Sequence, residues 1–241
     1  LLVNDDGYNA EGILLLQKKL KKYGEVTIVA PKNSMSAKSC SLTIRTGLKV
    51  VEESENVYSV EGFPADCTSF GLVELNKHFD LVVSGCNHGL NISDDINYSG
   101  TIGACVESIK HKVPAIAFSC EFNFNIVDKY FDKVMNYIIE NQLISSKYIL
   151  NINFPKGNYV KDIKLTKSIS TEYDRAYYKH EDGLYYCQRL EICKEIPIDS
   201  ENYAVNNEII SICPLTNSYF NSNLYDLSLI HISEPTRLGM I

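Results

Sequence analysis

The segment DLVVSGCNHGLN, residues 80–91, joins an apolar run to a polar, glycine-rich stretch, and LLVNDDG at residues 1–7 shows the same change. A third case is EVTIVAPKNSMSAKS, residues 25–39, where Pro31 closes the apolar run. Short, continuously apolar runs are typical of buried strands in a parallel sheet. We therefore predict a strand at the start of each segment and a polar loop after it.

Segments with helical periodicity separate these strands. We predict helices over Glu11–Tyr23, Pro64–Asn76, Thr101–His111 and Ile126–Asn141, and we place the polar stretch Ser84–Ser99 outside any strand. Alternation of this kind predicts a Rossmann-like, three-layer α/β fold whose mostly parallel sheet is covered on both faces. Ligands of such sheets bind beyond the carboxyl ends of the strands, so the three polar loops should meet at one edge.

The pattern along the chain divides it into three parts. Residues 1–157 carry the strand–helix alternation and form the predicted Rossmann-like catalytic domain. Residues 158–226 are rich in tyrosine and alternate in the manner of strands, which predicts a β-rich C-terminal arm for oligomerisation. Residues 227–241, LSLIHISEPTRLGMI, fit neither pattern, and we expect them to be a non-native tail.

Composition excludes several classes of protein. The chain has 241 residues, 45% hydrophobic and 22% charged, as expected of a globular protein, and its net charge of −7 argues against binding a nucleic-acid polymer. No apolar run approaches the ~20 residues that span a bilayer, and no secretory signal opens the chain, so we expect a cytoplasmic protein without membrane contact. Its eight scattered cysteines form no CxxC pair, which favours free thiols.

Oxygen-bearing side chains gather in the three predicted loops. Asp5 and Asp6 follow the first strand, where Gly7 frees the backbone and both carboxylates can turn toward one hard divalent cation. Ser36 follows the second strand, and the amides of Asn87 and Asn91 follow the third. The alternatives for these residues are an acidic helix-capping turn, a solvated loop and a turn rich in asparagine and glycine.

Another polar group opens a predicted helix. The sequence Ser99-Gly100-Thr101 places hydroxyls at a helix N-terminus, where unpaired backbone N–H groups favour a phosphate, although an ordinary N-cap gives the same pattern. Asp66 of EGFPADC is in the first turn of another helix, where an acid is more often a favourable charge than a catalyst. A lone loop histidine such as His88 is usually just exposed.

The order of six segments resembles that of the SurE (survival protein E) family of nucleotidases: NDDGYNAEGI, VAPKNSMSAKS, EGFPADC, DLVVSGCNHGLN, DINYSGTIGACVES and VPAIAFS. The resemblance runs from Leu1 through Phe154 and resumes weakly at Asn202–Leu215. It implies a divalent-metal-dependent phosphatase that hydrolyses nucleoside 5′- and 3′-monophosphates. It also implies a homodimer or tetramer in which the C-terminal arms are exchanged.

The resemblance implies specific roles for the residues that match its motifs. One divalent ion per subunit, Mg²⁺ or Mn²⁺, would be held by Asp5, Asp6, Ser36 and Asn87, of which Asp5, Asp6 and Asn87 would also serve catalysis. The residues that would bind the phosphate are Asn91, Ser99, Gly100 and Thr101.

Two segments depart from the family pattern, but all four implied metal ligands are present. Ser39-Cys40-Ser41 replaces the usual Gly-x-(Ser/His)-Ser, and Phe63 replaces a threonine. We therefore expect an active enzyme. Two alternatives are a non-catalytic module that binds a nucleotide or phosphate on the same scaffold, and an assembly protein that acts through its tyrosine-rich arm.

Overall fold

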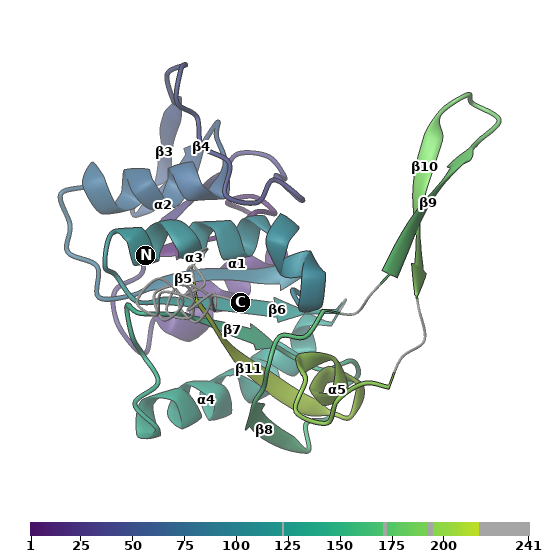
Figure 1. The fold of residues 1–241 in the computed structure, drawn as a ribbon. Coiled ribbons are helices and arrows are strands. Elements are labelled where there is room, and N and C mark those ends of the chain that lie inside the picture. Colours follow the sequence, from purple (N-terminus) through teal and green to yellow (C-terminus); the bar gives the residue numbers. More distant parts are fainter. Residues whose placement is uncertain (122, 171–172, 192–194, 217–241) are drawn as a thin grey trace, which may run out of the picture.

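The computed structural model describes residues 1–121, 123–170, 173–191 and 195–216, and a mixed sheet of nine strands lies at its centre (Figure 1). The strand order is β3-β4-β2-β1-β5-β6-β7-β11-β8. The strands are β1 Leu2–Val3, β2 Ile28–Pro31, β3 Val50–Ser54, β4 Val57–Val60, β5 Val82–His88, β6 Ala115–Cys120, β7 Ile149–Asn153, β8 Asp162–Leu165 and β11 Ile209–Leu215.

The six strands from β4 to β7 in this order pair parallel to one another, while β3 and β11 run antiparallel to their inner neighbours. The carboxyl ends of β1, β2 and β5 therefore lie at the same edge, as predicted. The helices are α1 Glu11–Leu20, α2 Pro64–Val73, α3 Gly100–Lys110, α4 Phe124–Glu140 and α5 Glu201–Asn206, with a 3₁₀ helix, η1, at Ser93–Tyr98.

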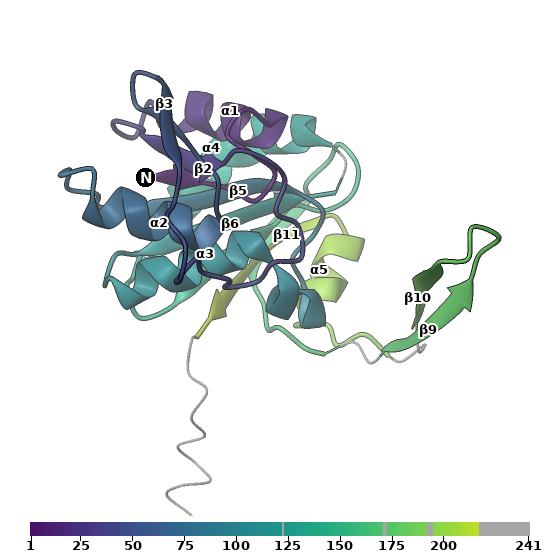
Figure 2. The ribbon, with the colours of Figure 1, turned by 90° about the horizontal axis from the view of Figure 1, so that it is seen from above.

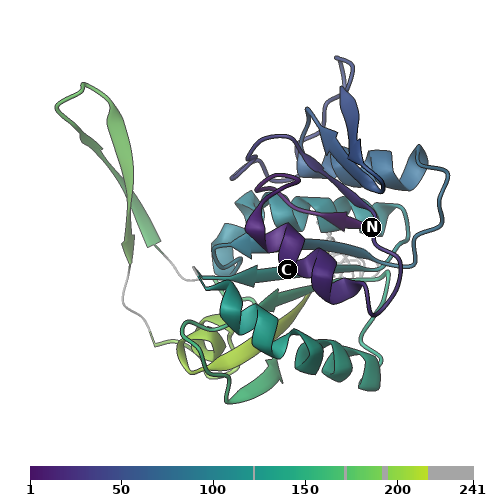
Figure 3. The ribbon, with the colours of Figure 1, turned by 180° about the vertical axis from the view of Figure 1, so that it is seen from behind.

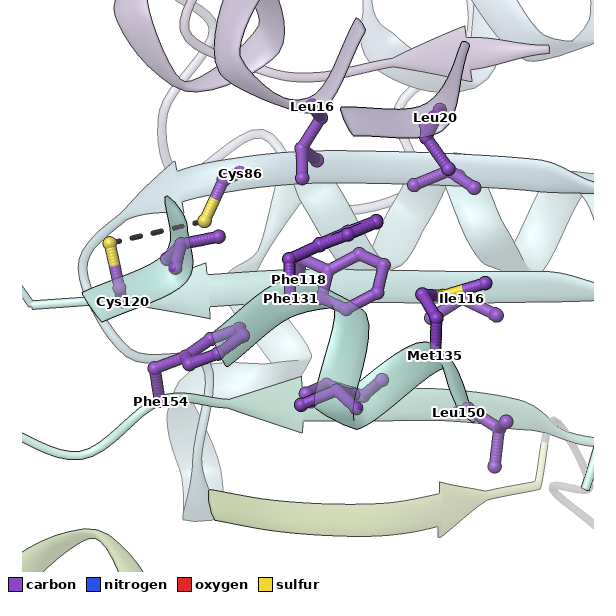
Figure 4. Packing of buried hydrophobic residues seen from close by; sticks show 14 of the residues in the cluster. Leu16, Leu20, Cys86, Ile116, Phe118, Cys120, Phe131, Met135, Leu150 and Phe154 are labelled. Atoms are coloured by element: carbon purple, nitrogen blue, oxygen red, sulfur yellow. Dashed lines mark hydrogen bonds between the residues drawn. The ribbon is translucent and has the colours of Figure 1, made fainter. Parts of the chain in front are cut away.

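Helices cover both faces of the sheet, which confirms the predicted three-layer fold. The α1 and α4 helices pack on one face and α2 and α3 on the other (Figure 2). On the α1–α4 face the rings of Phe118, Phe131 and Phe154 lie together, with centroids of Phe118 and Phe131 5.2 Å apart (Figure 4). Burial of large apolar side chains of this kind stabilises the layer by about 2 kcal/mol each.

The predicted ends of three elements are wrong by three residues or more, and one of them is α2, which ends at Val73 rather than Asn76. The α1 helix ends at Leu20 rather than Tyr23, because Tyr23 lies in a turn and its hydroxyl donates to Asp132 of α4. The strand predicted to end at Val83 continues to His88, since its backbone pairs with β6 beyond an irregularity in the register. Gly85 permits this course: its φ is +123°, and a Cβ atom there would lie 2.2 Å from a carbonyl oxygen of β6.

The stretch 158–226 contributes to two different parts of the molecule. The β8, α5 and β11 elements extend the main sheet, whereas β9, Tyr173–Lys179, and β10, Tyr185–Glu191, form a hairpin that projects away from it (Figure 3). The tail predicted at 227–241 lies outside the described residues. Among those described, no helix has the length and apolar character needed to cross a membrane. All seven described cysteines are free, as predicted.

Candidate active site

A closed turn carries the paired acids past the end of β1. The buried side chain of Asn4 donates through Nδ2 to the Gly7 carbonyl at 2.8 Å and accepts from the Gly7 N–H through Oδ1 at 3.2 Å. Asparagine favours turns of this kind because its side chain substitutes for backbone partners. Asn4 was not among the residues predicted for the site, although its spacing from Gly7 is a recognisable signal.

Asp5 is buried against the start of α3. Its Oδ1 accepts a hydrogen bond of 2.6 Å from the Thr101 hydroxyl, and a Cβ atom on Gly100 would lie 2.8 Å from the Asp5 Cβ. Burial raises the pKa of the Asp5 carboxyl to about 6, the Thr101 hydroxyl opposes the rise, and the charge of Asp6 adds to it. Sequence reasoning placed Thr101 on the phosphate, whereas the structure joins its hydroxyl to an acid.

Asp6 lies on the other side of the turn, beside the end of β5. Its Oδ2 accepts from the His88 backbone N–H at 3.4 Å, and burial raises the pKa of its carboxyl, which that N–H opposes. Asp6 also lines a cavity of about 400 Å³ with residues that include Glu11, His88 and Phe124. His88 itself is exposed, as the sequence suggested.

The loop after β2 reaches the acids through its backbone. The Met35 N–H donates to the Asp5 carbonyl at 2.7 Å, and the Ser39 N–H donates to the Tyr98 carbonyl at 3.0 Å, just before α3. Ser36 is exposed, and its Oγ lies 3.2 Å from the Oγ of Ser34. The loop therefore passes beside Asp5, and Ser36 directly follows the residue that contacts Asp5.

Asn87 and Asn91 have different surroundings, because Asn87 lies among the last paired residues of β5 and Asn91 lies in the loop after it. The partly buried Asn87 donates from Nδ2 to the Gly89 carbonyl at 2.8 Å. The buried Asn91 donates from Nδ2 to the Ser119 hydroxyl at 2.8 Å and receives a hydrogen bond from Asn151 Nδ2 on its backbone carbonyl at 2.7 Å. Asn91 thus anchors the loop, and its phosphate contact stays a prediction.

Two residues that anchor Asn91 were not predicted from the sequence, namely Asn151 and Asn153. The Asn153 side chain accepts from the Asn91 backbone N–H at 2.8 Å and donates to its carbonyl at 3.1 Å. Together with Asn151, it stands in the otherwise apolar strand β7, and buried asparagines in such a strand are the signal that could have found them. Ser99 is the N-cap of α3, since its hydroxyl oxygen accepts from the Ile102 N–H at 3.1 Å.

Some of the predicted residues contact one another directly, and others approach the acids only through neighbouring residues in the chain. Asp5 touches the start of α3 directly, whereas Ser36 and Asn87 approach through their chain neighbours Met35 and His88. Within the described residues, neither the Ser36 nor the Asn87 side chain hydrogen-bonds to an acid. Asp5, Asp6, Ser36 and Asn87 nevertheless lie at or just beyond the carboxyl ends of β1, β2 and β5, which share one edge of the sheet.

The oxygen donors at this edge suit a hard divalent cation. The described ranges hold no group of three or more histidines, cysteines and acids arranged to hold a metal ion, and the predicted ligand set has only two acids beside a hydroxyl and an amide. No lysine or arginine forms an ion pair with Asp5 or Asp6 in the described chain, and the pKa values of both carboxyls are raised by burial. A cation would favour their charged forms, and hard cations prefer such oxygens.

Fold and site together define an α/β protein with an acidic, hydroxyl-bearing site beyond the carboxyl ends of parallel strands and against a helix N-terminus. The family profile described as Survival protein SurE matches residues 1–175. The chain is 36% identical over 234 residues to a protein of Clostridium beijerinckii named 5′-nucleotidase SurE, covering 89% of this chain and 91% of that protein. The chain belongs to the SurE family.

Further comparisons extend over nearly the whole chain. A protein of Clostridium botulinum strain Kyoto, also named 5′-nucleotidase SurE, is 36% identical over 252 residues, which cover 98% of this chain and 96% of that protein. The crystal structure of the SurE protein from Aquifex aeolicus matches with a TM-score of 0.82 and 33% identity, covering 97% of this chain and 98% of that one. The layered α/β architecture is therefore that of a solved relative.

Proposed function

We propose that this chain hydrolyses nucleoside 5′- and 3′-monophosphates to nucleoside and phosphate, with one divalent ion, Mg²⁺ or Mn²⁺, per subunit. Its family membership and the 5′-nucleotidase relatives support the class of enzyme. The observation that carries the proposal is the pair of adjacent carboxylates, in which buried Asp5 is held against the N-terminus of α3 by the Thr101 hydroxyl and Asp6 is partly buried beside it.

The residues that would hold the ion are Asp5, Asp6, Ser36 and Asn87, because they supply carboxylate, hydroxyl and amide oxygens at one edge of the sheet. When bound, the ion supplies Lewis-acid polarisation of the phosphoryl group and a lower pKa of its water. Asp5 is oriented for this role by the Thr101 hydroxyl, and Asp6 by the backbone N–H of His88.

The remaining chemistry falls to the protein. The first backbone N–H groups of α3, at Gly100 and Thr101, would stabilise the negative charge that develops on the phosphoryl oxygens, and Ser99 and Asn91 would complete the phosphate site. One of the two aspartates accepts the proton of the attacking water. The water oxygen forms a bond to phosphorus as the bond between phosphorus and the ester oxygen breaks, and the proton taken up by the aspartate passes to the departing nucleoside oxygen.

The test is phosphate release from AMP and from 3′-AMP by the full chain at an enzyme concentration far below that of substrate. We expect many turnovers, loss of release in EDTA, and recovery with Mn²⁺ or Mg²⁺. Asp5→Asn should lower turnover by several orders of magnitude. Tight nucleotide binding without turnover would instead favour a binding module on the same scaffold.

We also propose that the hairpin β9–β10 joins two copies of the chain in the cytoplasm. Its tyrosines Tyr177, Tyr178, Tyr185 and Tyr186 are exposed, and an isolated two-stranded hairpin has little stability in water. The free cysteines suit a reducing compartment. Removal of the hairpin should reduce the assembly measured by sedimentation to a single copy of the shortened chain. An assembly that keeps two or more copies would contradict this role.

A further inference from the structure

A second, larger cavity opens beside the candidate active site. Its volume is about 680 Å³, and the loop at 42–47, the end of β4 and the start of α2 form its walls. Its apolar lining residues are Met35, Leu42, Ile44, Val60 and Phe63. Ile44 is 84% exposed and Phe63 is half-buried, so an aliphatic side chain and part of an aromatic side chain are accessible to a ligand.

The cavity and the paired acids share two segments of chain. Met35 lines the cavity, and its N–H donates to the Asp5 carbonyl at 2.7 Å. Phe63 also lines it, and the next residue, Pro64, lies against Gly100: a Cβ atom there would be 3.1 Å from the Pro64 Cγ and 2.8 Å from the Asp5 Cβ. A ligand whose phosphate lies at the start of α3 can therefore extend its other end into this cavity.

A buried carboxylate holds two walls of the cavity together. Asp66, in the first turn of α2, accepts from the Phe63 N–H at 2.9 Å, from the Thr43 N–H at 2.9 Å and from the Thr43 hydroxyl at 2.8 Å. The loop at 42–47 is thus pinned to the start of the helix. Asp66 is therefore a positioning residue. The sequence had suggested only a favourable charge in the first turn of the helix.

Among the described residues, the ion pairs around the cavity involve two lysines but not its arginine. Lys32 and Lys49 both pair with Glu61, at 3.3 Å and 2.9 Å. Arg45 is exposed on the cavity wall and forms no ion pair within the described residues. A planar guanidinium can stack on a ring or donate to its acceptor atoms, which an ammonium group does less well.

We propose that this cavity binds the base of the nucleotide, with Phe63 stacking on the ring, Ile44 against it and Arg45 donating to its edge. The proposal rests on the proposed nucleotidase function and adds the residues that select a nucleotide over other phosphomonoesters. Aromatic side chains are sequence-tolerant platforms for bases, because every base has a π face.

The experiment compares AMP with ribose 5-phosphate, which lacks only the base. Phe63→Ala should lower the ratio of kcat/KM for AMP to that for ribose 5-phosphate by about 5-fold to 150-fold, the range of a lost base–aromatic stack. The variant should fold, since Phe63 caps α2 through its backbone N–H. Phe63→Tyr should retain the ratio. Val73→Ala, at the exposed far end of α2, is the matched control.

A second measurement needs neither metal nor turnover. Saturation-transfer NMR should detect adenosine bound to the wild-type chain, to Phe63→Tyr and to Val73→Ala, with a much weaker signal for Phe63→Ala. Equal signals for Phe63→Ala and wild type, no signal for wild type, or an unchanged ratio of kcat/KM would each overturn the proposal. If wild type bound adenosine but released no phosphate from either substrate, the nucleotidase function would fail while the base site would stand.

Discussion

Replacing Asp5 by asparagine should abolish activity and at the same time stabilise the metal-free protein at neutral pH. The side chain is 4% exposed, and burial raises the pKa of its carboxyl from 3.8 to about 6. Asparagine retains an oxygen that can accept from the Thr101 hydroxyl and carries no charge. The substitution therefore removes a buried charge and keeps the hydrogen bond.

The sign and size of the effect follow from proton linkage. Below about pH 4 the folded and unfolded states of the wild-type chain both hold the Asp5 proton, so the group adds no pH dependence. Between pH 4 and 6 only the folded state holds it, and the free energy of unfolding falls as pH rises. Above pH 6 the folded state carries the full cost of burying the charged Asp5 carboxylate. This cost is about 3 kcal/mol, from the rise in pKa from 3.8 to about 6 at roughly 1.36 kcal/mol per pKa unit.

The assay is urea unfolding followed by far-UV circular dichroism, in EDTA, between pH 4 and pH 8. The stability of Asp5→Asn relative to wild type should rise by about 3 kcal/mol between pH 4 and pH 8, whereas Glu181→Gln, which alters an exposed carboxylate in the hairpin turn, should show no such rise. A gain independent of pH, or a loss of stability at pH 8, would refute the burial argument. Added Mn²⁺ should reverse the order, because it stabilises only the wild-type site.

Three further variants test the geometry of the site. Thr101→Val removes a charge-assisted hydrogen bond worth about 1.5–3 kcal/mol, so kcat/KM for AMP should fall roughly tenfold or more, and Thr101→Ser should restore it. Gly100→Ala forces a methyl group against Asp5 and should lower kcat, while Gly24→Ala, with open space around it, should not. Asn91→Leu leaves a buried serine hydroxyl without its partner and should lower the free energy of unfolding by about 1–3 kcal/mol in urea; unchanged stability would argue that Asn91 acts only on the ligand.

Much of the fold could be predicted because apolar runs and helical periodicity are local properties of the chain. The alternation of strands and helices through Asn153 predicted the parallel sheet and its two helical layers, and both are present. The end of β5 could not be predicted, since the pairing of polar residues up to His88 depends on the neighbouring strand. The same holds for β8 and β11, which join the main sheet across a long separation in sequence.

The same distinction between local sequence and tertiary contacts applies to the candidate site. The sequence alone determined that acids, hydroxyls and amides follow the strands, because those residue types and their order are written in the chain. Only the tertiary structure decided that the Thr101 hydroxyl serves Asp5, that Asn91 is held by Asn151, and that Phe63 faces a cavity. Hydrogen bonds and burial depend on distances between segments far apart in sequence, and those distances exist only once the sheet has formed.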